Sequence, residues 1–141
     1  MEIIMKSITP ETVHGIVHRY DREQIFKYNG WPSVCRDENG TLYAVASSMR
    51  MSHVDPTGKD CMWISRDEGK SWTPSMVVND TYFDDRDAGI ISLGGGKMVL
   101  SWFSLCYDDF CEPIQGYDWF GEPEKAIAKA SAKCGKDFPR K

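Results

Sequence analysis

The eight residues from Ser65 to Trp72, Ser-Arg-Asp-Glu-Gly-Lys-Ser-Trp, constrain the fold of this chain more than any other stretch. They join two short apolar segments, so they must reverse the chain and supply partners for inward-facing backbone N–H groups. Asp67 can accept such N–H groups, and Ser65 adds a hydroxyl. Gly69 can adopt a positive φ, and the ring of Trp72 can cover the turn, burying roughly 200 Å². The sequence therefore predicts a structural turn without a catalytic role.

Short strand patterns separated by Gly, Asn and Asp dominate most of the chain, which predicts an all-β antiparallel fold. The tail differs, because Ala and Lys recur at helical spacing after Pro123 and Gly135 can cap a helix. We therefore divide the chain into a β part, 1–121, and a short C-terminal helical tail, 122–141. The expected strands are 12–20, 32–37, 41–48, 61–65, 75–80, 88–93 and 97–103.

An internal repeat relates two parts of the β region. The segment 30–48 can be placed over 86–104 without a gap, at an offset of 56 residues. Apolar positions then meet apolar positions, for example Val34 and Ile90, and the turn at Gly40 meets the turn at Gly96. Chance agreement between two β-hairpins is the alternative. A repeat of this length is typical of four-stranded propeller blades with long loops.

Composition excludes several classes of function. The formal net charge is −4 and the pI is near 5.3, so a basic nucleic-acid-binding face is not expected. No run of apolar residues approaches membrane-spanning length, and the N-terminus lacks a signal-peptide core. We expect a cytoplasmic protein as the chain is written, with secretion open if a segment precedes Met1. We expect free thiols, no metal and no cofactor, since Cys106 and Cys111 are not flanked by further ligands.

Written as a pattern, the opening stretch is S-x-D-x-G-x-S-W, which resembles the Asp box (BNR repeat) of the sialidase-like six-bladed β-propellers. It matches at all five defining positions: Ser65, Asp67, Gly69, Ser71 and Trp72. The resemblance implies that the box joins the third and fourth strands of a blade, away from the active site. It also implies about two four-stranded antiparallel blades, blade 1 at about 31–80 and blade 2 from about 86, or the N-terminal portion of a propeller.

The resemblance implies a glycoside hydrolase-like protein, an exo-glycosidase that acts on terminal sugars of glycans. In sialidases the motif Tyr-Arg-Ile-Pro stands at the start of the first strand, and its arginine binds the substrate carboxylate. Here Asn29 or Gly30 stands where that arginine is expected, before Trp31-Pro32. The alternative is a non-catalytic Asp-box propeller module that binds carbohydrate or protein. Because the remaining catalytic groups of the family come from later blades, we expect this chain alone to be inactive.

Two loops supply the candidate site residues. In sialidases the loop after the second strand carries an arginine and the aspartate that acts as general acid and base. The resemblance therefore implies that Asp55 is the catalytic residue and Arg50 a substrate-binding residue. His53 lies between them in the same loop. The second loop, just before the repeated inner strand, contributes Asp85, Arg86 and Asp87. A polar surface loop without function is the alternative at both places.

Two blades cannot close a propeller, so apolar residues of the second blade are expected to be exposed. The expected examples are Val99, Leu100, Trp102 and Phe103. Such open edges allow self-association, unless the helical tail covers them or further blades follow.

Overall fold

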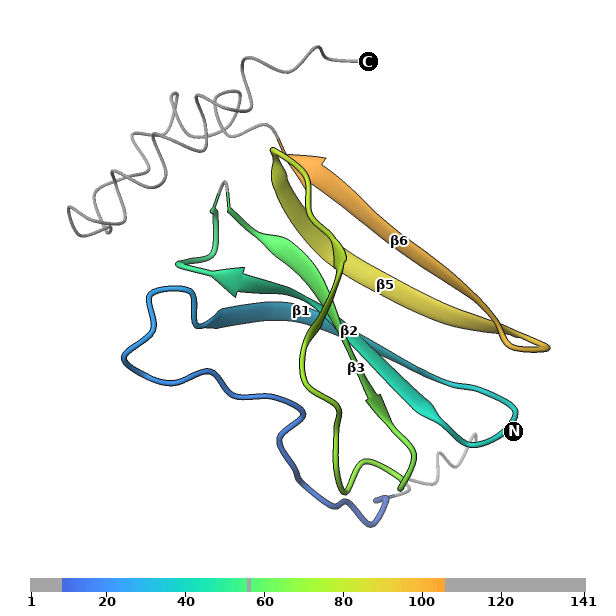
Figure 1. The fold of residues 1–141 in the computed structure, drawn as a ribbon. Coiled ribbons are helices and arrows are strands. Elements are labelled where there is room, and N and C mark those ends of the chain that lie inside the picture. Colours follow the sequence, from blue (N-terminus) through green and yellow to red (C-terminus); the bar gives the residue numbers. More distant parts are fainter. Residues whose placement is uncertain (1–8, 56, 106–141) are drawn as a thin grey trace, which may run out of the picture.

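The computed structural model describes residues 9–55 and 57–105, and this part of the chain is all-β (Figure 1). The expected helix at 122–141, the end of the 1–121 unit, and Cys106, Cys111 and Cys134 lie outside the described residues. The strands are β1 (Tyr28–Arg36), β2 (Leu42–Arg50), β3 (Lys59–Ser65), β4 (Met76–Asn79), β5 (Asp84–Gly94) and β6 (Lys97–Leu105).

The strands form two antiparallel sheets. The first has the order β1-β2-β3-β4, and the second is the hairpin β5-β6. Six of the seven expected strands are therefore confirmed: six of their twelve ends are extended by one to four residues, four are shortened by one, and two coincide. The largest extensions, of four residues, are at the starts of β1 and β5, and β5 begins at Asp84. The acidic stretch expected to be a loop before the strand is thus part of the strand itself.

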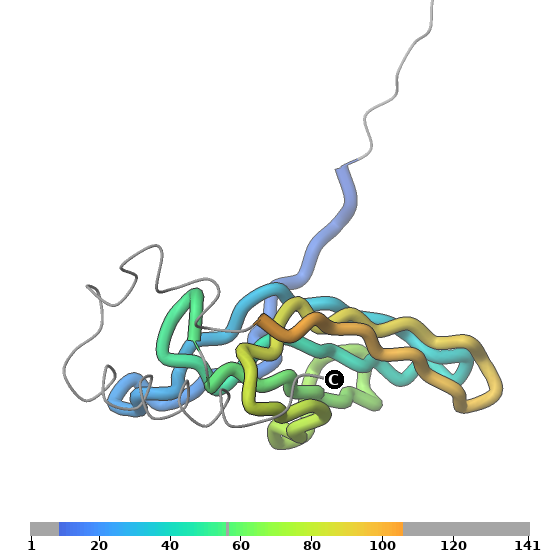
Figure 2. The backbone as a smooth tube through the Cα atoms, turned by 90° about the horizontal axis from the view of Figure 1, so that it is seen from above, coloured from blue at the N-terminus to red at the C-terminus, as the bar shows by residue number. Residues whose placement is uncertain are grey.

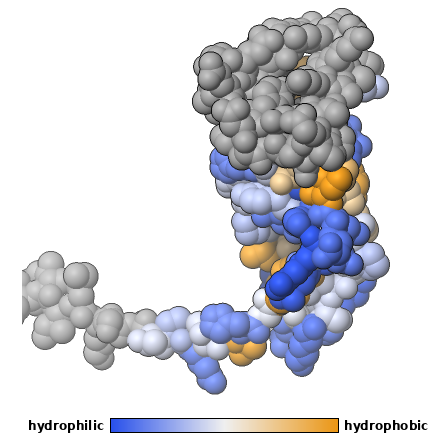
Figure 3. All heavy atoms as spheres, turned by 90° about the vertical axis from the view of Figure 1, so that its left-hand side faces the viewer, coloured by the Kyte–Doolittle hydropathy of each residue, from blue (hydrophilic) through white to orange (hydrophobic). Residues whose placement is uncertain are grey.

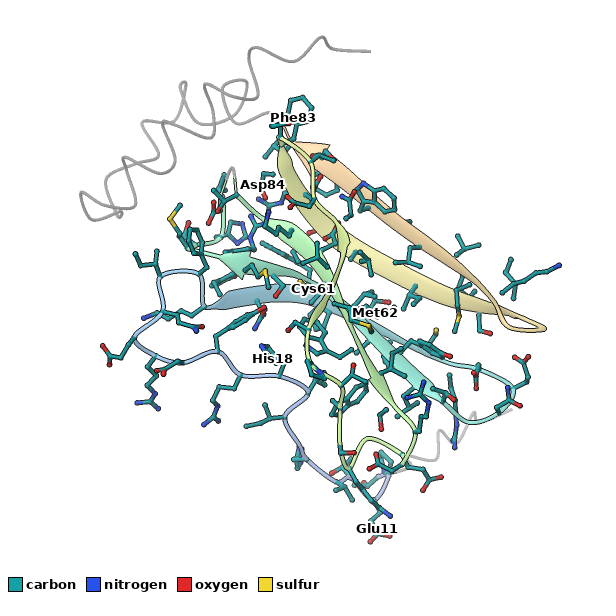
Figure 4. All side chains as sticks on the ribbon, in the orientation of Figure 1. Glu11, His18, Cys61, Met62, Phe83 and Asp84 are labelled. Carbon is teal, nitrogen blue, oxygen red and sulfur yellow. The ribbon has the colours of Figure 1, made fainter. Side chains whose placement is uncertain are left out.

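The expected strand at 12–20 is wrong, because this segment forms no β-ladder. It lies along the first sheet, where the His18 ring stacks on Trp63 with centroids 5.4 Å apart. The Tyr20 hydroxyl lies 2.8 Å from Ser48 Oγ. Figure 4 shows His18 directed from this segment toward the sheet. The apolar residues of this segment, Val13, Ile16 and Val17, are exposed, so the contacts of His18 and Tyr20 hold it against the sheet.

The repeat predicted from the sequence is present in the strand register. The hairpins β1-β2 and β5-β6 pair equivalent residues at the same offset of 56, and their turns lie at the same end of the molecule (Figures 1 and 2). The common register runs from the turns back to Gly30 and Arg86, and it differs at the open end, where Tyr28 pairs with Arg50 but Asp84 pairs with Leu105. The equivalent pairs are Gly30–Ser47 with Arg86–Phe103, Ser33–Val45 with Gly89–Ser101, Val34–Ala44 with Ile90–Leu100, and Cys35–Tyr43 with Ile91–Val99.

The two hairpins also share a β-bulge. The register shifts by one residue between Gly30 and Ser33 in β1, and between Arg86 and Gly89 in β5. A non-glycine residue with positive φ occupies the same place in both bulges, Trp31 at 52° and Asp87 at 54°, 56 residues apart. Such a conformation is uncommon outside glycine and costs on the order of 1–3 kcal/mol. Its repetition supports a common architecture for the two hairpins.

The core lies between the two sheets. Val45 of β2 is completely buried against Ala88 and Ile90 of β5, with Cys35, Tyr43, Met62 and Leu100 around them. Val99, Trp102 and Phe103 are exposed, as predicted, but the expectation for Leu100 is wrong because its side chain faces this core. A second cluster, Ala44, Ala46, Cys61 and Trp63, lies on the opposite face of the first sheet, below His18.

The stretch from Ser65 to Trp72 forms the predicted turn, between β3 and β4. Asp67 accepts hydrogen bonds from the Ser65 hydroxyl (2.8 Å), and from the backbone N–H (2.9 Å) and hydroxyl (2.5 Å) of Ser71. These bonds lower the pKa of Asp67 to about 2. Gly69 has φ of +84°, and Trp72 Nε1 donates to its carbonyl at 3.2 Å. Asp67 binds one backbone N–H rather than several, because hydroxyls occupy its other positions.

Ser65→Ala is expected to destabilise the protein by roughly 1–3 kcal/mol. Ser65 is 1% exposed, and its hydroxyl accepts the Gly69 N–H at 2.9 Å, so the alanine variant leaves that donor without a partner. Urea denaturation followed by tryptophan fluorescence measures the change. The matched control is Ser101→Ala, an exposed serine whose loss is expected to change stability by less than about 0.5 kcal/mol. Equal effects of the two substitutions would contradict the structural role of the turn.

Candidate functional site

Charged residues gather where the end of β2, the loop that follows it and the start of β5 meet. Figure 4 shows Asp84 at this end of β5. The carboxylate of Asp84 lies 2.6 Å from Nη1 of Arg50 through Oδ1, and accepts a hydrogen bond from Nη2 at 2.8 Å through Oδ2. Both side chains are completely buried. Buried charges require partners of opposite sign, so this pair fixes β5 against β2.

All three guanidinium nitrogens of Arg50 are occupied. Nε donates to the carbonyl of Ser52 at 3.2 Å, Nη1 to that of Asp85 at 3.1 Å, and Nη2 to that of His53 at 3.0 Å, in addition to the contacts with Asp84. The loop after β2 therefore folds around the Arg50 guanidinium. In this arrangement Arg50 has no donor directed at a ligand, although the sequence placed it among the substrate-binding residues.

Gly58 permits the ion pair to lie against the main chain. A Cβ at this position would overlap Nη1 of Arg50 and approach Oδ1 of Asp84. The Gly58 carbonyl also accepts the backbone N–H of Asp85 at 3.2 Å, which ties the loop to β5. A side chain at position 58 would thus separate the two charges that hold the sheets together.

Asp55, the predicted catalytic residue, is completely buried next to the ion pair. Its carboxylate accepts hydrogen bonds from the backbone N–H of Met51 and from both the backbone N–H (2.7 Å) and hydroxyl (2.6 Å) of Thr57. Its own N–H donates to Asp84 at 3.0 Å. These contacts stabilise the loop conformation. They leave the carboxylate without contact to solvent, which a general acid needs when it meets a substrate.

The predicted residues of β5 have three different environments. Asp85 is completely buried and binds Thr81 through the backbone N–H (2.6 Å) and hydroxyl (2.8 Å), and Ser104 through its hydroxyl (2.6 Å). Asp87 is exposed at the bulge. Arg86, between them, is 7% exposed. The structure therefore brings Arg50, Asp55, Asp85 and Arg86 into one cluster and leaves Asp87 at its surface.

Arg86 retains donors for a ligand. Its Nη1 donates to the His53 carbonyl at 3.0 Å and to Asp84 at 3.1 Å, while Nε and Nη2 have no hydrogen bond to any residue that the structure describes. The guanidinium carbon lies 4.4 Å from the centroid of the Trp31 ring and 6.0 Å from that of Phe103. Stacking on an aromatic face leaves the edge of the guanidinium free for a planar acceptor.

Aromatic and imidazole rings surround Arg86. The His53 ring contacts Trp31 edge-on with centroids 4.9 Å apart, and the centroid of the Tyr28 ring lies 6.2 Å from that of Trp31. His53, Tyr28 and Phe103 are exposed. We call Arg86, Trp31, His53 and Phe103 the Arg86 site. It combines one fixed cationic fork with exposed rings, which suits a ligand that carries an acid group and an apolar or sugar face.

Asp60 is a buried carboxylate that no sequence argument singled out. It is 1% exposed, and its hydrogen bonds are long: 3.4 Å from the Ser47 hydroxyl and 3.5 Å from Asn79 Nδ2. Burial raises the pKa of Asp60 to about 6, since these bonds offset little of the lost hydration. The only signal in the sequence is a single acid within the apolar strand Lys59–Ser65.

A hollow of about 710 Å³ lies outside this cluster, between residues 20–26 and the ends of β2 and β3. Its lining is mostly apolar, from Tyr20, Ile25, Phe26 and Met49, so it offers little that could perform chemistry. On the face seen in Figure 3, apolar side chains form small groups separated by polar ones. Polar contacts therefore identify the candidate site better than the size of a hollow does.

Metal ligands do not gather in the described part of the chain, where no group of three His, Cys, Asp or Glu residues could hold an ion. Cys35 and Cys61 are free thiols, and burial raises the pKa of both. In residues 9–55 and 57–105 there is also no helix of the length and apolarity needed to cross a membrane.

Sequence reasoning missed two features of the site. Neither Asp84 nor Trp31 was among the predicted site residues, yet Asp84 pairs with Arg50 and Trp31 covers Arg86. Neither contact could be read from spacing, because 34 residues separate Arg50 from Asp84. For Trp31 a signal was available: under the 56-residue offset it takes the place of Asp87, which was a predicted site residue.

Comparison with known proteins found no relative: no family model matches the chain, and no curated protein or solved structure shows significant similarity to it.

Asp60→Asn is expected to remove a pH dependence of stability. Because the folded state raises the pKa of Asp60 from 3.8 to about 6, folding favours the protonated acid. Its contribution to the free energy of unfolding is present below pH 3.8 and is lost as the pH rises through about 6. Asparagine resembles the protonated acid, so the variant should exceed the wild type in stability at pH 7 and match it near pH 4.

Urea denaturation of both proteins from pH 4 to 7 measures this difference. The control is Asp87→Asn, the same substitution at an exposed position, which is expected to leave the wild-type pH profile unchanged. Parallel profiles for wild type and Asp60→Asn would show that burial does not perturb this carboxyl.

Proposed function

We propose that this chain is part of a sialidase-like Asp-box β-propeller. Support comes from the turn Ser65–Trp72, which lies between the third and fourth strands of a four-stranded antiparallel sheet. The shared register and bulge of β1-β2 and β5-β6 support a second unit that begins in the same way. The packing of β5-β6 on one face of the first sheet is the arrangement expected of neighbouring blades.

We propose further that the Arg86 site binds a carbohydrate that carries a carboxylate. The observation that carries this proposal is the state of the Arg86 guanidinium, which is held by Asp84 and the His53 carbonyl while Nε and Nη2 have no partner among the described residues. A carboxylate can accept both of these N–H groups in a bidentate contact. The exposed rings of His53 and Phe103 offer faces for the sugar.

The register also supports a role for Arg86. It occupies in β5 the position that Gly30 occupies in β1, and Gly30 is one of the two positions at which the arginine of a sialidase is expected. The carboxylate-binding arginine of this chain would then belong to the second hairpin instead of the first.

Hydrolysis of a glycosidic bond is the second candidate function. It is favoured by the position of Asp55, whose backbone N–H binds the same Asp84 carboxylate that holds Arg86. Binding is the better-supported function for this chain, because the Asp55 carboxylate and the Arg50 guanidinium are completely buried and fully engaged. Turnover would require the loop after β2 to open and release Asp55.

Arg86→Ala is expected to weaken binding of an acidic sugar by about 10- to 100-fold, since a hydrogen bond to a charged group contributes about 1.5–3 kcal/mol. Isothermal titration calorimetry with free sialic acid and with glucuronate measures the affinity, and glucose serves as the neutral analogue of glucuronate. Arg86→Lys keeps the charge and loses the planar fork, so it should recover only part of the affinity.

The control variant is Arg36→Ala, which removes an exposed arginine at the far end of β1, where it pairs with Glu68. It should bind as the wild type does. Equal affinity for glucuronate and glucose, or full binding by Arg86→Ala, would refute the assignment. A fluorogenic sialoside assay addresses the second candidate: turnover that is lost in Asp55→Asn, with Asp87→Asn as control, would make hydrolysis the better description.

A further inference from the structure

The outer edge of β6 is unpaired in the part of the chain that the structure describes. β6 bonds to β5 along one side, and no described strand lies along the other. Figure 1 shows β6 as the outermost strand, on the side of β5 away from the first sheet. The main-chain N–H and C=O groups along this edge therefore lack strand partners from the described residues.

The repeat shows what this edge is equivalent to. In the repeat, β5 is equivalent to β1 and β6 is equivalent to β2. One edge of β2 pairs with β1, and its other edge pairs with β3 from Leu42 to Ser48. The offset of 56 residues carries this stretch to 98–104 of β6. In the first unit, then, the equivalent edge is occupied by an antiparallel strand over seven consecutive residue pairs.

β6 carries few of the features that protect an edge strand from pairing. Its nine residues contain one charge, Lys97 at the start, and no proline. Three large apolar side chains are almost half exposed: Val99 at 45%, Trp102 at 46% and Phe103 at 48%. Long apolar edges without charge, proline or a bulge pair readily with other strands.

We propose that β6 pairs antiparallel with β6 of a second copy of this chain, around a two-fold axis at Ser101. The two hairpins then form one four-stranded sheet with the order β5-β6-β6-β5, the same number of strands as the first sheet. An antiparallel pairing of identical strands is self-complementary, so it closes as a dimer and does not extend into a filament.

The sequence of β6 fits this register. With Ser101 opposite itself, Val99 lies opposite Phe103 of the second copy on one face, and Leu100 lies opposite Trp102 of the second copy on the other. Pairs of aromatic with aliphatic residues stabilise antiparallel strands by roughly 0.2–1 kcal/mol each. Lys97 lies opposite Leu105 at the two ends, so the pairing brings no like charges together. This inference rests on the composition and self-complementary register of β6 and not on the proposed ligand.

Two double variants test the pairing and its register. Val99→Lys with Phe103→Lys places lysines opposite each other in the proposed dimer, whereas Val99→Lys with Phe103→Glu places a lysine opposite a glutamate. The two variants lose the same apolar side chains. We expect the first to raise the dimer dissociation constant at least about tenfold relative to the second. Sedimentation equilibrium measures the constant, and circular dichroism checks that both variants fold.

The wild type should sediment as a dimer of the 16.1 kDa chain. Ser101→Cys should form an intermolecular disulfide between the two introduced thiols, identified by peptide mass spectrometry, and Met98→Cys should not. A monomer with protected β6 amides in hydrogen exchange would show that residues 106–141 cover the edge and would overturn the proposal. A monomer with exchanging amides, or a dimer that both double variants retain equally, would overturn it as well.

Discussion

The buried contact between Arg50 and Asp84 is the interaction on which the described structure most depends. Two full charges without solvent are tolerated only when each has partners, and here they come from different sheets. Arg50 ends β2, Asp84 begins β5, and the loop between β2 and β3 is held around both by carbonyl groups and by Asp55. The charge contact thus fixes the loop and the position of the second hairpin together. Burial raises the pKa of Asp84, and the hydrogen bonds and charge of Arg50 oppose that rise.

The charged residues around this contact have different roles. All the guanidinium nitrogens of Arg50 make structural contacts. The Asp55 carboxylate holds the loop before β3, and the Asp85 carboxylate holds the loop after β4. Arg86 shares Asp84 with Arg50 but keeps part of its guanidinium free and lies against Trp31. The candidate site is therefore a small accessible end of a larger buried network. A ligand that bound Arg86 would meet a group already oriented by the fold, which reduces the entropy lost on binding.

The sequence predicted those parts of the fold that depend on local chemistry. The turn at Ser65–Trp72 was predictable because each of its residue types has a specific hydrogen bond or backbone conformation to supply, and the six strands followed from alternation and turn residues. The 56-residue repeat anticipated the common register of the two hairpins. The segment 12–20 was wrongly expected to be a strand, because its alternating apolar residues Val13, Ile16 and Val17 stay exposed and pair with no strand.

The charged site was predictable only in part. Arg50, Asp55, Asp85 and Arg86 stood out as residue types, and they do gather in one place. Their burial could not be inferred, since a run of acids and an arginine looks solvated until its partners from another strand are known. The sequence signal for Asp60 was weak, a single acid in an apolar strand, because the hydrogen bonds it makes come from β2 and β4.

The bulge that opens each hairpin has a consequence for how such a unit can vary. One extra residue at Trp31 or Asp87 resets the inside-outside alternation, so the first three residues of the strand are decoupled from the rest. Beyond the bulge, the strand must keep the small and branched side chains that fit its neighbour. Ahead of it, Gly30 and Arg86 occupy one and the same place with opposite chemical character. The fold can therefore exchange the groups at its rim from one unit to the next while the stacking surface stays constant.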